Sequence, residues 1–173
     1  KDPIGMSGVR LDTRVHIITG ANTALQNSQK CIHRCGLQMD QIMLQPLASG
    51  HAVLTEDEKD LGVCVIDIGG GTTDIAVYTN GAIRHTAVIP VAGDLITKDL
   101  AQALRTPHSA AEYIKIHYGV AIPDMDGLDE MVEVTSVGDR QPRQISRRVL
   151  ASVIGPRVGE NLELTINAKR RSG

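Results

Sequence analysis

The amino-acid sequence predicts an α/β fold. In the first part of the chain, short runs of β-branched residues alternate with stretches in which apolar residues have helical spacing. The nearly unbroken apolar run at 63–68 is typical of a strand buried on both faces, and it leads directly into Gly69-Gly70-Gly71. Asn80-Gly81 then separates two further β-rich runs, as the turn of a type I′ hairpin would. These features predict strands joined by tight turns, with helices packed against them.

Composition limits the kinds of protein this chain can be. It has 173 residues, of which 42% are hydrophobic, so it can bury a core. Because it has no Phe, no Trp and only three Tyr, that core must be aliphatic, and platforms for stacking nucleic-acid bases are not expected. The formal net charge of −2 gives no basic surplus, so we expect no nucleic-acid partner. No apolar run has the length of a membrane span, no secretory signal opens the chain, and it starts at Lys1, as an excised piece would.

The cysteines are Cys31, Cys35 and Cys64, and an odd number without extracellular features favours reduced thiols in the cytoplasm. The spacing of Cys31, His33 and Cys35 also invites interpretation as a metal site. On a helix, however, Cys31 and Cys35 share a face while His33 points elsewhere, and no fourth ligand is near. We therefore interpret the cysteines as core thiols.

The segment before the glycines divides into several predicted elements. Apolar and polar residues alternate at 9–19, which predicts a strand with one buried face and with His16 on its polar side. The others are a helix at 24–35 ended by Gly36, a short strand at 41–44, a helix at 46–54 begun by Pro46, and an acidic, exposed connection at 55–60.

The segment after the glycines is also expected to contain both strands and helices. Its predicted elements are a strand at 83–91, a helix at 95–104 capped by Asp94 or Thr97, a helix at 107–118 with Lys115 on its solvated face, a strand at 131–137 and a basic helix at 145–158. Gly155-Pro156 lies inside the last helix and is expected to kink or end it. Residues 159–173 are able to continue as helix, with nothing to pack against.

The run from Asp67 to Thr73 combines groups that bind a phosphate chain. Successive glycines allow backbone angles closed to other residues and bring bare N–H groups against a ligand. Thr72 and Thr73 add hydroxyl donors, and the Asp67 carboxylate suits a bridging Mg²⁺, which takes one or two carboxylates besides phosphate oxygens and water. The run is not a Walker A loop, because no Gly-Lys-Ser/Thr follows it. A tight glycine hairpin without a ligand is the simpler alternative.

Asp-Ile-Gly-Gly-Gly-Thr-Thr-Asp at 67–74 resembles the second phosphate loop of the actin-like (ribonuclease H-like) ATPase superfamily. Further stretches resemble the FtsA family of bacterial cell-division proteins within it, among them 4–11, 15–19, 135–140 and 150–157. By this resemblance, the chain is mostly the second lobe of the actin-like fold, with a small α+β outer subdomain. The implied parts are the end of the first lobe at 1–44, the inner core of the second lobe at 45–118 with its phosphate loop at 67–73, the outer subdomain at 119–158, and a truncated C-terminal helix at 159–173.

The same resemblance implies that ATP and Mg²⁺ bind at this loop, with Asp67 holding the metal directly or through water. The phosphate-binding residues would be Gly69, Gly70, Gly71, Thr72 and Thr73. Gln45, just before Pro46, lies where the superfamily has a water-orienting Gln or the Glu of a Glu-Pro pair. An amide is a poor general base, so Asp67 and Gln45 as catalytic residues would support slow hydrolysis at most. Alternatively, Gln45 only begins its helix.

For the basic residues near the outer subdomain, the resemblance implies a contact with the C-terminal tail of FtsZ. These residues are Arg143, Arg147, Arg148 and Arg157, and a solvated charged helix face is the alternative for each. The resemblance further implies a protein that tethers FtsZ polymers to the inner membrane and self-associates into actin-like filaments. It would work at the cytoplasmic face of that membrane at the division site, through a C-terminal membrane helix that this sequence does not contain.

Two other functions of the superfamily remain open on the residues alone. A small-molecule kinase would carry a substrate-binding acid or a sugar-recognition loop, and the sequence shows neither. A chaperone-like ATPase would have Glu-Pro where this chain has Gln45-Pro46, and a peptide-binding domain would follow it.

Overall fold

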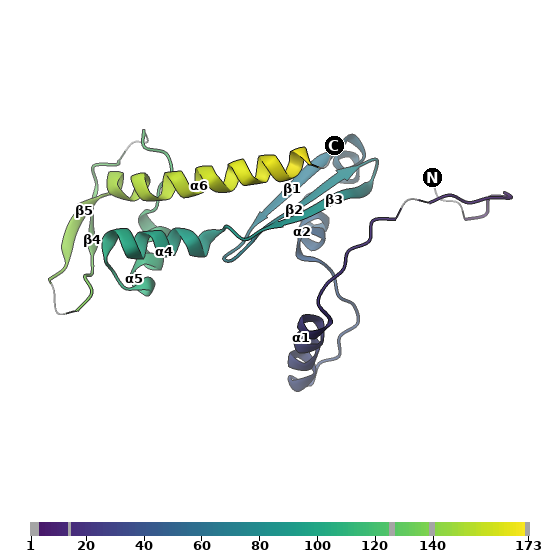
Figure 1. Cartoon of the computed structure of the whole chain (residues 1–173), viewed down its shortest axis with the longest axis horizontal. Coiled ribbons are helices and arrows are strands. Elements are labelled where there is room, and N and C mark those ends of the chain that lie inside the picture. The colour runs from purple at the N-terminus through teal and green to yellow at the C-terminus, as the bar shows by residue number, and fades with distance from the viewer. Residues whose placement is uncertain (1–3, 14, 125–126, 139–140, 172–173) are drawn as a thin grey trace. The chain divides into compact units, whose positions relative to one another are not determined.

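The computed structural model describes residues 4–13, 15–124, 127–138 and 141–171, and the chain divides into two compact units, residues 1–42 and 43–173 (Figure 1). In the first unit, helix α1 (Asn22–Arg34) confirms the predicted helix. Gly36 follows it with a φ of +76°, in the left-handed region that commonly ends helices.

The strands predicted at 9–19 and 41–44 are wrong for the described residues, which are extended or irregular and exposed there. A strand needs a neighbouring strand to satisfy its backbone N–H and C=O groups, and neither segment has one in the described part of the chain. Helix α1 likewise buries none of its residues. Cys31 and Cys35 are therefore exposed rather than core thiols, and only Cys64 is partly buried, which raises the pKa of its thiol.

The second unit contains a three-stranded antiparallel sheet in the order β1-β2-β3. Its strands are β1 (Val63–Ile68), β2 (Thr73–Thr79) and β3 (Ala82–Ile89), close to the predicted runs. Asn80 and Gly81 have φ of 53° and 72°, and two successive positive φ angles are what the predicted type I′ turn requires.

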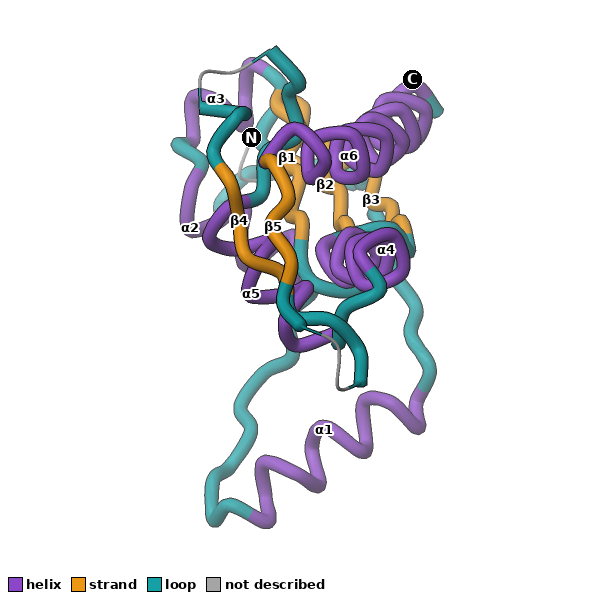
Figure 2. Tube along the Cα trace, turned by 90° about the vertical axis from the view of Figure 1, so that its left-hand side faces the viewer, coloured by secondary structure: helices purple, strands orange, loops and turns teal. Residues whose placement is uncertain are grey.

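Helices cover both faces of this sheet (Figure 2). Along β2, Ile75 and Val77 belong to the core beneath α6 (Arg147–Arg170), whereas Ala76 and Tyr78 face α2 (Gln45–Val53). The predicted burial of β1 on both faces is only partly right. Because β1 is an edge strand, Ile66 and Ile68 remain 44% and 57% exposed.

The acidic segment after α2 is a helix, α3 (Glu56–Leu61), and not the predicted connection. Thr55 begins it with a capping box: its Oγ1 accepts from the Glu58 N–H, and the Glu58 carboxylate accepts from the Thr55 N–H. The segment is largely exposed, as predicted, except that Lys59 is buried and lies 2.7 Å from the Glu56 carboxylate.

The rest of the unit packs around a second core. Helices α4 (Gly93–Leu104) and α5 (His108–Tyr118) confirm the two predicted helices, and α5 leads towards a hairpin of β4 (Met131–Val134) and β5 (Arg143–Ser146). The buried residues of this core are aliphatic, as the composition predicts: Leu100, Leu104, Ala111, Ile114, Val132, Val134, Leu150 and Ile154.

Gly155-Pro156 was expected to kink or end this helix, but α6 continues through both residues, so the predicted end is wrong. Pro156 removes one hydrogen bond to the Ser152 carbonyl, but Ser152 is exposed and water is able to replace the missing donor. Close packing explains the glycine at position 155, because a Cβ at Gly155 would lie 2.7 Å from the Ala121 carbonyl oxygen. The second half of α6 lies over β2 and β3 (Figure 1), where Thr165 is buried, so the expectation that it has nothing to pack against is also wrong.

Candidate functional site

The glycine loop connects β1 to β2 and is fastened to the start of α4. The Gly69 N–H donates to the Thr72 carbonyl (2.9 Å), which closes the loop. The Gly93 N–H donates to the Gly69 carbonyl (3.1 Å) and the Asp94 N–H to the Gly70 carbonyl (2.7 Å). Helix α4 therefore uses loop carbonyls to satisfy its first N–H groups, and the predicted side-chain cap is wrong.

Limited space, rather than an unusual backbone angle, favours glycine at two of the three positions, Gly69 and Gly70. None of Gly69, Gly70 and Gly71 has a positive φ, so the predicted conformational reason for them is wrong. A Cβ at Gly70 would lie 3.2 Å from Asp94 Oδ1, and one at Gly69 would lie 3.3 Å from the Thr72 carbonyl oxygen. Gly70 and Gly71 are exposed, and within the described residues their N–H groups donate to no backbone carbonyl. Two N–H donors therefore face solvent at the loop.

Asp67 of β1 lies beside this loop, and two residues of α2 hold its carboxylate. Ser49 Oγ donates to Asp67 Oδ2 over 2.6 Å, and Gln45 Nε2 donates to the same oxygen over 3.2 Å. The structure thus brings together the two residues predicted as catalytic and adds Ser49, which sequence reasoning missed. The available signal was spacing, because Ser49 is four residues after Gln45 and shares its helix face. Asp67 Oδ1 accepts no hydrogen bond from the described residues.

The hydroxyls of the two threonines point into the protein instead of adding donors for a ligand. Thr72 Oγ1 donates to Asp74 Oδ2 over 2.9 Å. Thr73 is fully buried, and its Oγ1 donates to the Val91 carbonyl over 2.8 Å while accepting from Asn161 Nδ2 over 2.9 Å. Contacts of these threonines with a ligand would therefore involve their backbone groups.

Lys115 does not lie on a solvated face of α5, so the predicted position of its side chain is wrong. Its ammonium group lies 2.8 Å from Thr97 Oγ1, 3.2 Å from the Gly93 carbonyl and 2.7 Å from the Glu112 carboxylate. The hydrogen bond from Lys115, followed by that from Thr97, lowers the pKa of Glu112. Because Gly93 also binds the glycine loop, a positive charge is placed next to the loop.

A metal ion at this site would need ligands beyond the protein. The part of the chain that the structure describes has no group of three or more His, Cys, Asp or Glu that could hold a metal. Cys31, His33 and Cys35 therefore do not form such a group. Mg²⁺ needs only one or two carboxylates when phosphate oxygens and water complete its octahedron. A single carboxylate with one free oxygen, as at Asp67, beside free N–H donors fits that arrangement and does not fit an all-protein cage.

The four arginines predicted to bind a partner do not form one free basic patch. Arg143 donates to the Leu104 carbonyl, and Arg147 lies 3.0 Å from the Glu130 carboxylate and 3.1 Å from the Tyr118 carbonyl. Arg148 lies 3.2 Å from Asp129, but its side chain is 59% exposed.

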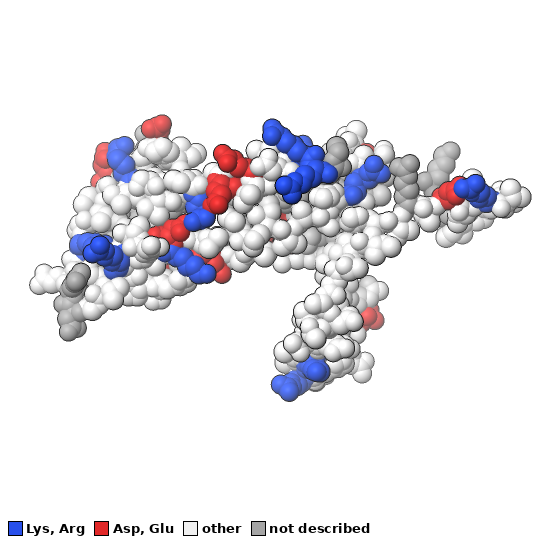
Figure 3. Space-filling model, in the orientation of Figure 1, with Lys and Arg blue, Asp and Glu red and all other residues white. Residues whose placement is uncertain are grey.

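Arg157 lies farther along α6, roughly 15 Å from Arg147 by the helical rise. It pairs with Asp99 of α4. Figure 3 shows basic and acidic groups side by side along this face. Among the three arginines in ion pairs, Arg148 has the most exposed side chain.

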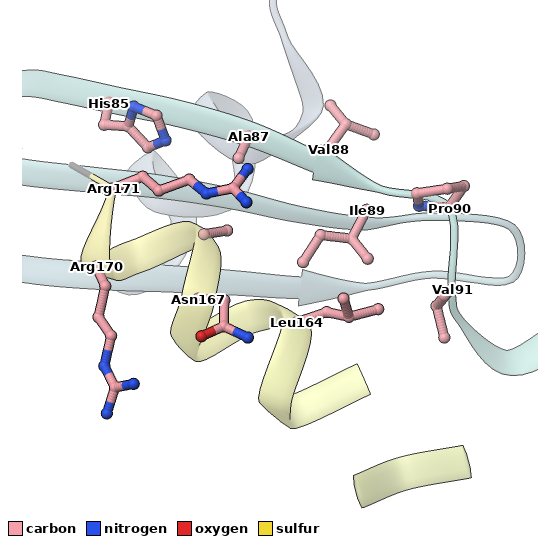
Figure 4. Close-up of a pocket in the computed structure, with 11 residues that line it drawn as sticks. His85, Ala87, Val88, Ile89, Pro90, Val91, Leu164, Asn167, Arg170 and Arg171 are labelled. Carbon is pink, nitrogen blue, oxygen red and sulfur yellow. The ribbon is translucent and has the colours of Figure 1, made fainter. Parts of the chain in front are cut away.

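A groove of about 790 Å³ lies between β3 and the end of α6 (Figure 4). Apolar residues such as Val88 and Leu164 line it, and Arg170 and Arg171 lie at its border. None of the predicted site residues lines this groove, so it is separate from the glycine loop.

Solved structures with the same arrangement belong to the actin-like class. MreB5 of Spiroplasma citri bound to ADP matches with a TM-score of 0.71 and 21% identity, over 87% of this chain and 48% of that one. A PilM–PilN type IV pilus biogenesis complex matches with a TM-score of 0.52 and 22% identity, over 56% of this chain and 29% of that one. The chain therefore has an actin-like fold, as the glycine motif predicts.

Sequence comparisons narrow the class further. The family model described as "Cell division protein FtsA" matches residues 64–170. Relatives of that name are 72% identical in Neisseria meningitidis serogroup B, over the whole chain, and 56% identical in Escherichia coli K12, over 95% of it. The chain belongs to the FtsA family of cell-division proteins. It spans 42% of the Neisseria protein and 39% of the E. coli protein.

Proposed function

We propose that this chain is part of an ATP-binding, actin-like cell-division protein that binds nucleotide at the glycine loop. The observation that carries the proposal is the convergence of Gln45, Ser49 and Asp67 beside the free N–H groups of Gly70 and Gly71. Two matched structures of MreB5 are described as bound to ADP and to AMPPNP, which supports a nucleotide as the ligand.

The roles of the residues follow from their chemistry. The N–H groups of Gly70 and Gly71 would donate to phosphate oxygens, with the backbone of Gly69, Thr72 and Thr73 shaping the loop. Asp67 Oδ1 would hold Mg²⁺ directly or through water, while Gln45 and Ser49 keep Oδ2 in place. Mg²⁺, when bound, neutralises charge on the phosphates.

Gln45 is also able to orient a water molecule, but its amide is a poor proton acceptor. Hydrolysis by Gln45 and Asp67 would therefore be slow at most.

Nucleotide binding is tested by calorimetry with Mg-ATP on the longer protein that contains this chain. Asp67→Ala is expected to abolish binding, because it removes the metal's carboxylate while leaving the apolar residues of β1 intact. Asp124→Ala, which removes an exposed carboxylate elsewhere, is the matched control and is expected to bind as the wild type does. Equal affinity of Asp67→Ala and wild type would contradict the proposal.

The partner we propose is the C-terminal tail of FtsZ, bound through Arg143, Arg147, Arg148 and Arg157. The whole protein would tether FtsZ polymers to the inner membrane at its cytoplasmic face and self-associate into filaments. Within the described residues, none of the helices combines the length and the apolar character that a membrane span requires. Each arginine already has an acidic or carbonyl partner, so an acidic tail would have to compete for it.

Binding of an FtsZ tail peptide tests this proposal, with fluorescence anisotropy as the readout. We expect affinity in the micromolar range that weakens as salt is raised, since a flexible acidic segment loses entropy on docking and its charges are screened. Arg148→Ala is expected to weaken binding of the peptide. Arg84→Ala, the same change at an exposed residue of β3, is expected to leave binding unchanged. A peptide that binds both variants equally well would place the partner site elsewhere.

A further inference from the structure

Asn161 of α6 is a buried polar residue whose hydrogen-bonding groups are all engaged. The residue is 7% exposed, and its Nδ2 donates to Thr73 Oγ1 over 2.9 Å and to the Val91 carbonyl over 2.7 Å. Its Oδ1 accepts from Thr165 Oγ1 over 3.4 Å. A buried amide is costly unless it is hydrogen-bonded, so this network specifies how α6 lies on the sheet.

The two acceptors of Asn161 border the glycine loop from both directions. Thr73 is the residue that follows the loop, and Val91 lies two residues before Gly93, whose N–H holds the Gly69 carbonyl. Thr73 Oγ1 also donates to the Val91 carbonyl over 2.8 Å, which closes a triangle of hydrogen bonds. One side chain of α6 thereby joins the start of β2 to the segment that begins α4.

A second contact fastens α6 to the same segment. Arg157, one helical turn before Asn161, pairs with Asp99 of α4 at 2.6 Å. The first N–H groups of α4 in turn bind the Gly69 and Gly70 carbonyls. Both contacts constrain the backbone that carries the free N–H groups of the loop.

We infer that Asn161 is a positioning residue for phosphate binding. It holds Thr73 and the Val91 carbonyl so that the N–H groups of Gly70 and Gly71 are aimed at a phosphate group before the ligand arrives, which lowers the cost of ordering the loop. The inference rests on the proposed nucleotide site and adds that the seating of α6 on the sheet determines affinity there.

Asn161→Leu separates this role from a merely structural one. Leucine has a similar size. The Val91 carbonyl keeps its hydrogen bond from Thr73, and Thr73 Oγ1 stays hydrogen-bonded as the donor of that bond. Thr165 is able to bond the carbonyl four residues earlier in its own helix instead. The variant is therefore expected to fold, with an unfolding temperature close to that of the wild type. Asn167→Leu, an exposed asparagine on the same helix, is the matched control.

The experiment measures the affinity of the longer protein for Mg-ATP, together with thermal unfolding without nucleotide. Asn161→Leu is expected to weaken binding by about tenfold, as loss of two hydrogen bonds that order the loop would, and Asn167→Leu to leave it unchanged. Thr73→Val removes one of the two acceptors of Asn161 and also the hydroxyl that donates to the Val91 carbonyl. In the double variant that carbonyl loses both donors, so the loss of affinity is expected to differ from the sum of the two single losses.

The outcomes distinguish this inference from the proposed function. If the wild type binds Mg-ATP but Asn161→Leu binds equally well, only the inference is overturned. It is also overturned if the losses of affinity from Asn161→Leu and Thr73→Val are additive. A third contrary result would be a fall in affinity that is fully explained by a lower unfolding temperature of Asn161→Leu. A wild-type protein that binds no nucleotide would overturn the proposed function itself.

Discussion

Arg157 of α6 binds Asp99 of α4 through two contacts, Nε to Oδ2 at 2.6 Å and Nη2 to Oδ1 at 3.2 Å. Planar, two-point pairing is the strong geometry for a guanidinium and a carboxylate, and the hydrogen bond that Arg157 donates to Asp99 raises the pKa of Arg157. Both side chains are largely covered, at 26% and 30% exposure. The pair therefore connects the helix that covers the sheet to the helix that supports the glycine loop.

Arg157→Leu is expected to lower the free energy of unfolding by about 1–2 kcal/mol, because it leaves Asp99 with a partly covered carboxylate and no cation. Urea unfolding measures the change. Arg148→Leu, which breaks an exposed pair with Asp129, is the control and should change stability by less than about 1 kcal/mol. Equal losses from both would mean that burial of the Arg157 pair does not matter. Because Arg157→Leu is itself expected to destabilise the protein, weaker peptide binding by an Arg157 variant would not by itself identify a partner contact.

Two glycines of α6 are expected to respond in opposite ways to replacement by alanine. A Cβ at Gly159 meets no atom within 4 Å, so Gly159→Ala should stabilise the helix by about 0.5–1 kcal/mol. A Cβ at Gly155 would lie 2.7 Å from the Ala121 carbonyl oxygen, so Gly155→Ala should destabilise by about 1–3 kcal/mol. Thermal unfolding of the two variants measures the difference, and a stabilising Gly155→Ala would contradict the close packing of Ala121 against α6.

Gly50 of α2 and Tyr78 of β2 form a second tight contact. A Cβ at Gly50 would lie 2.5 Å from Tyr78 Oη and 3.1 Å from Cζ, so Gly50→Ala is expected to cost about 1–3 kcal/mol. Tyr78→Phe should cost little, because the buried Oη has no hydrogen-bond partner among the described residues. Combining the two should recover part of the loss from Gly50→Ala, and chemical unfolding of the four proteins measures the recovery. Strict additivity would be evidence against the contact.

Glu112 is expected to make the stability of the protein depend on pH. Its hydrogen bonds from Lys115 and Thr97 hold its pKa below the usual value of 4.5, so this stabilisation is present above pH 4.5 and is lost as the pH falls through the folded-state pKa. Glu112→Gln should therefore be less stable than the wild type at about pH 7 and should lose less stability between about pH 7 and pH 3. Glu133→Gln, an exposed carboxylate of β4 without an ion pair among the described residues, is the control for denaturant unfolding at both pH values. Parallel losses in Glu112→Gln and wild type would refute the assignment.

The α/β class, the glycine loop and most of the helices could be predicted because their signals are local. Gly36 and Gly81 adopt the positive φ angles that glycine permits, and Asn80 completes the turn between β2 and β3. The nearly unbroken apolar run of β1 and the helical spacing of α1, α4 and α5 likewise need only neighbouring residues to be recognised. Asp67 was found with the loop because it is adjacent to it in sequence.

The tertiary structure alone decided which side chains meet at that loop. Ser49 and Asp67 are 18 residues apart, and Asn161 and Thr73 are 88 residues apart, so no periodicity relates them. Lys115 looked solvated because its own helix supplies no acceptor other than Glu112, whereas packing of α5 against α4 brings Thr97 and the Gly93 carbonyl to it. Gly155-Pro156 was expected to kink or end a helix, yet α6 continues past it, because packing on both sides of Pro156 outweighs one lost hydrogen bond. The sequence by itself determined most helices and the three-stranded sheet of the second unit, together with the position of the loop. Distances between elements, which only packing sets, decided what holds the loop in place.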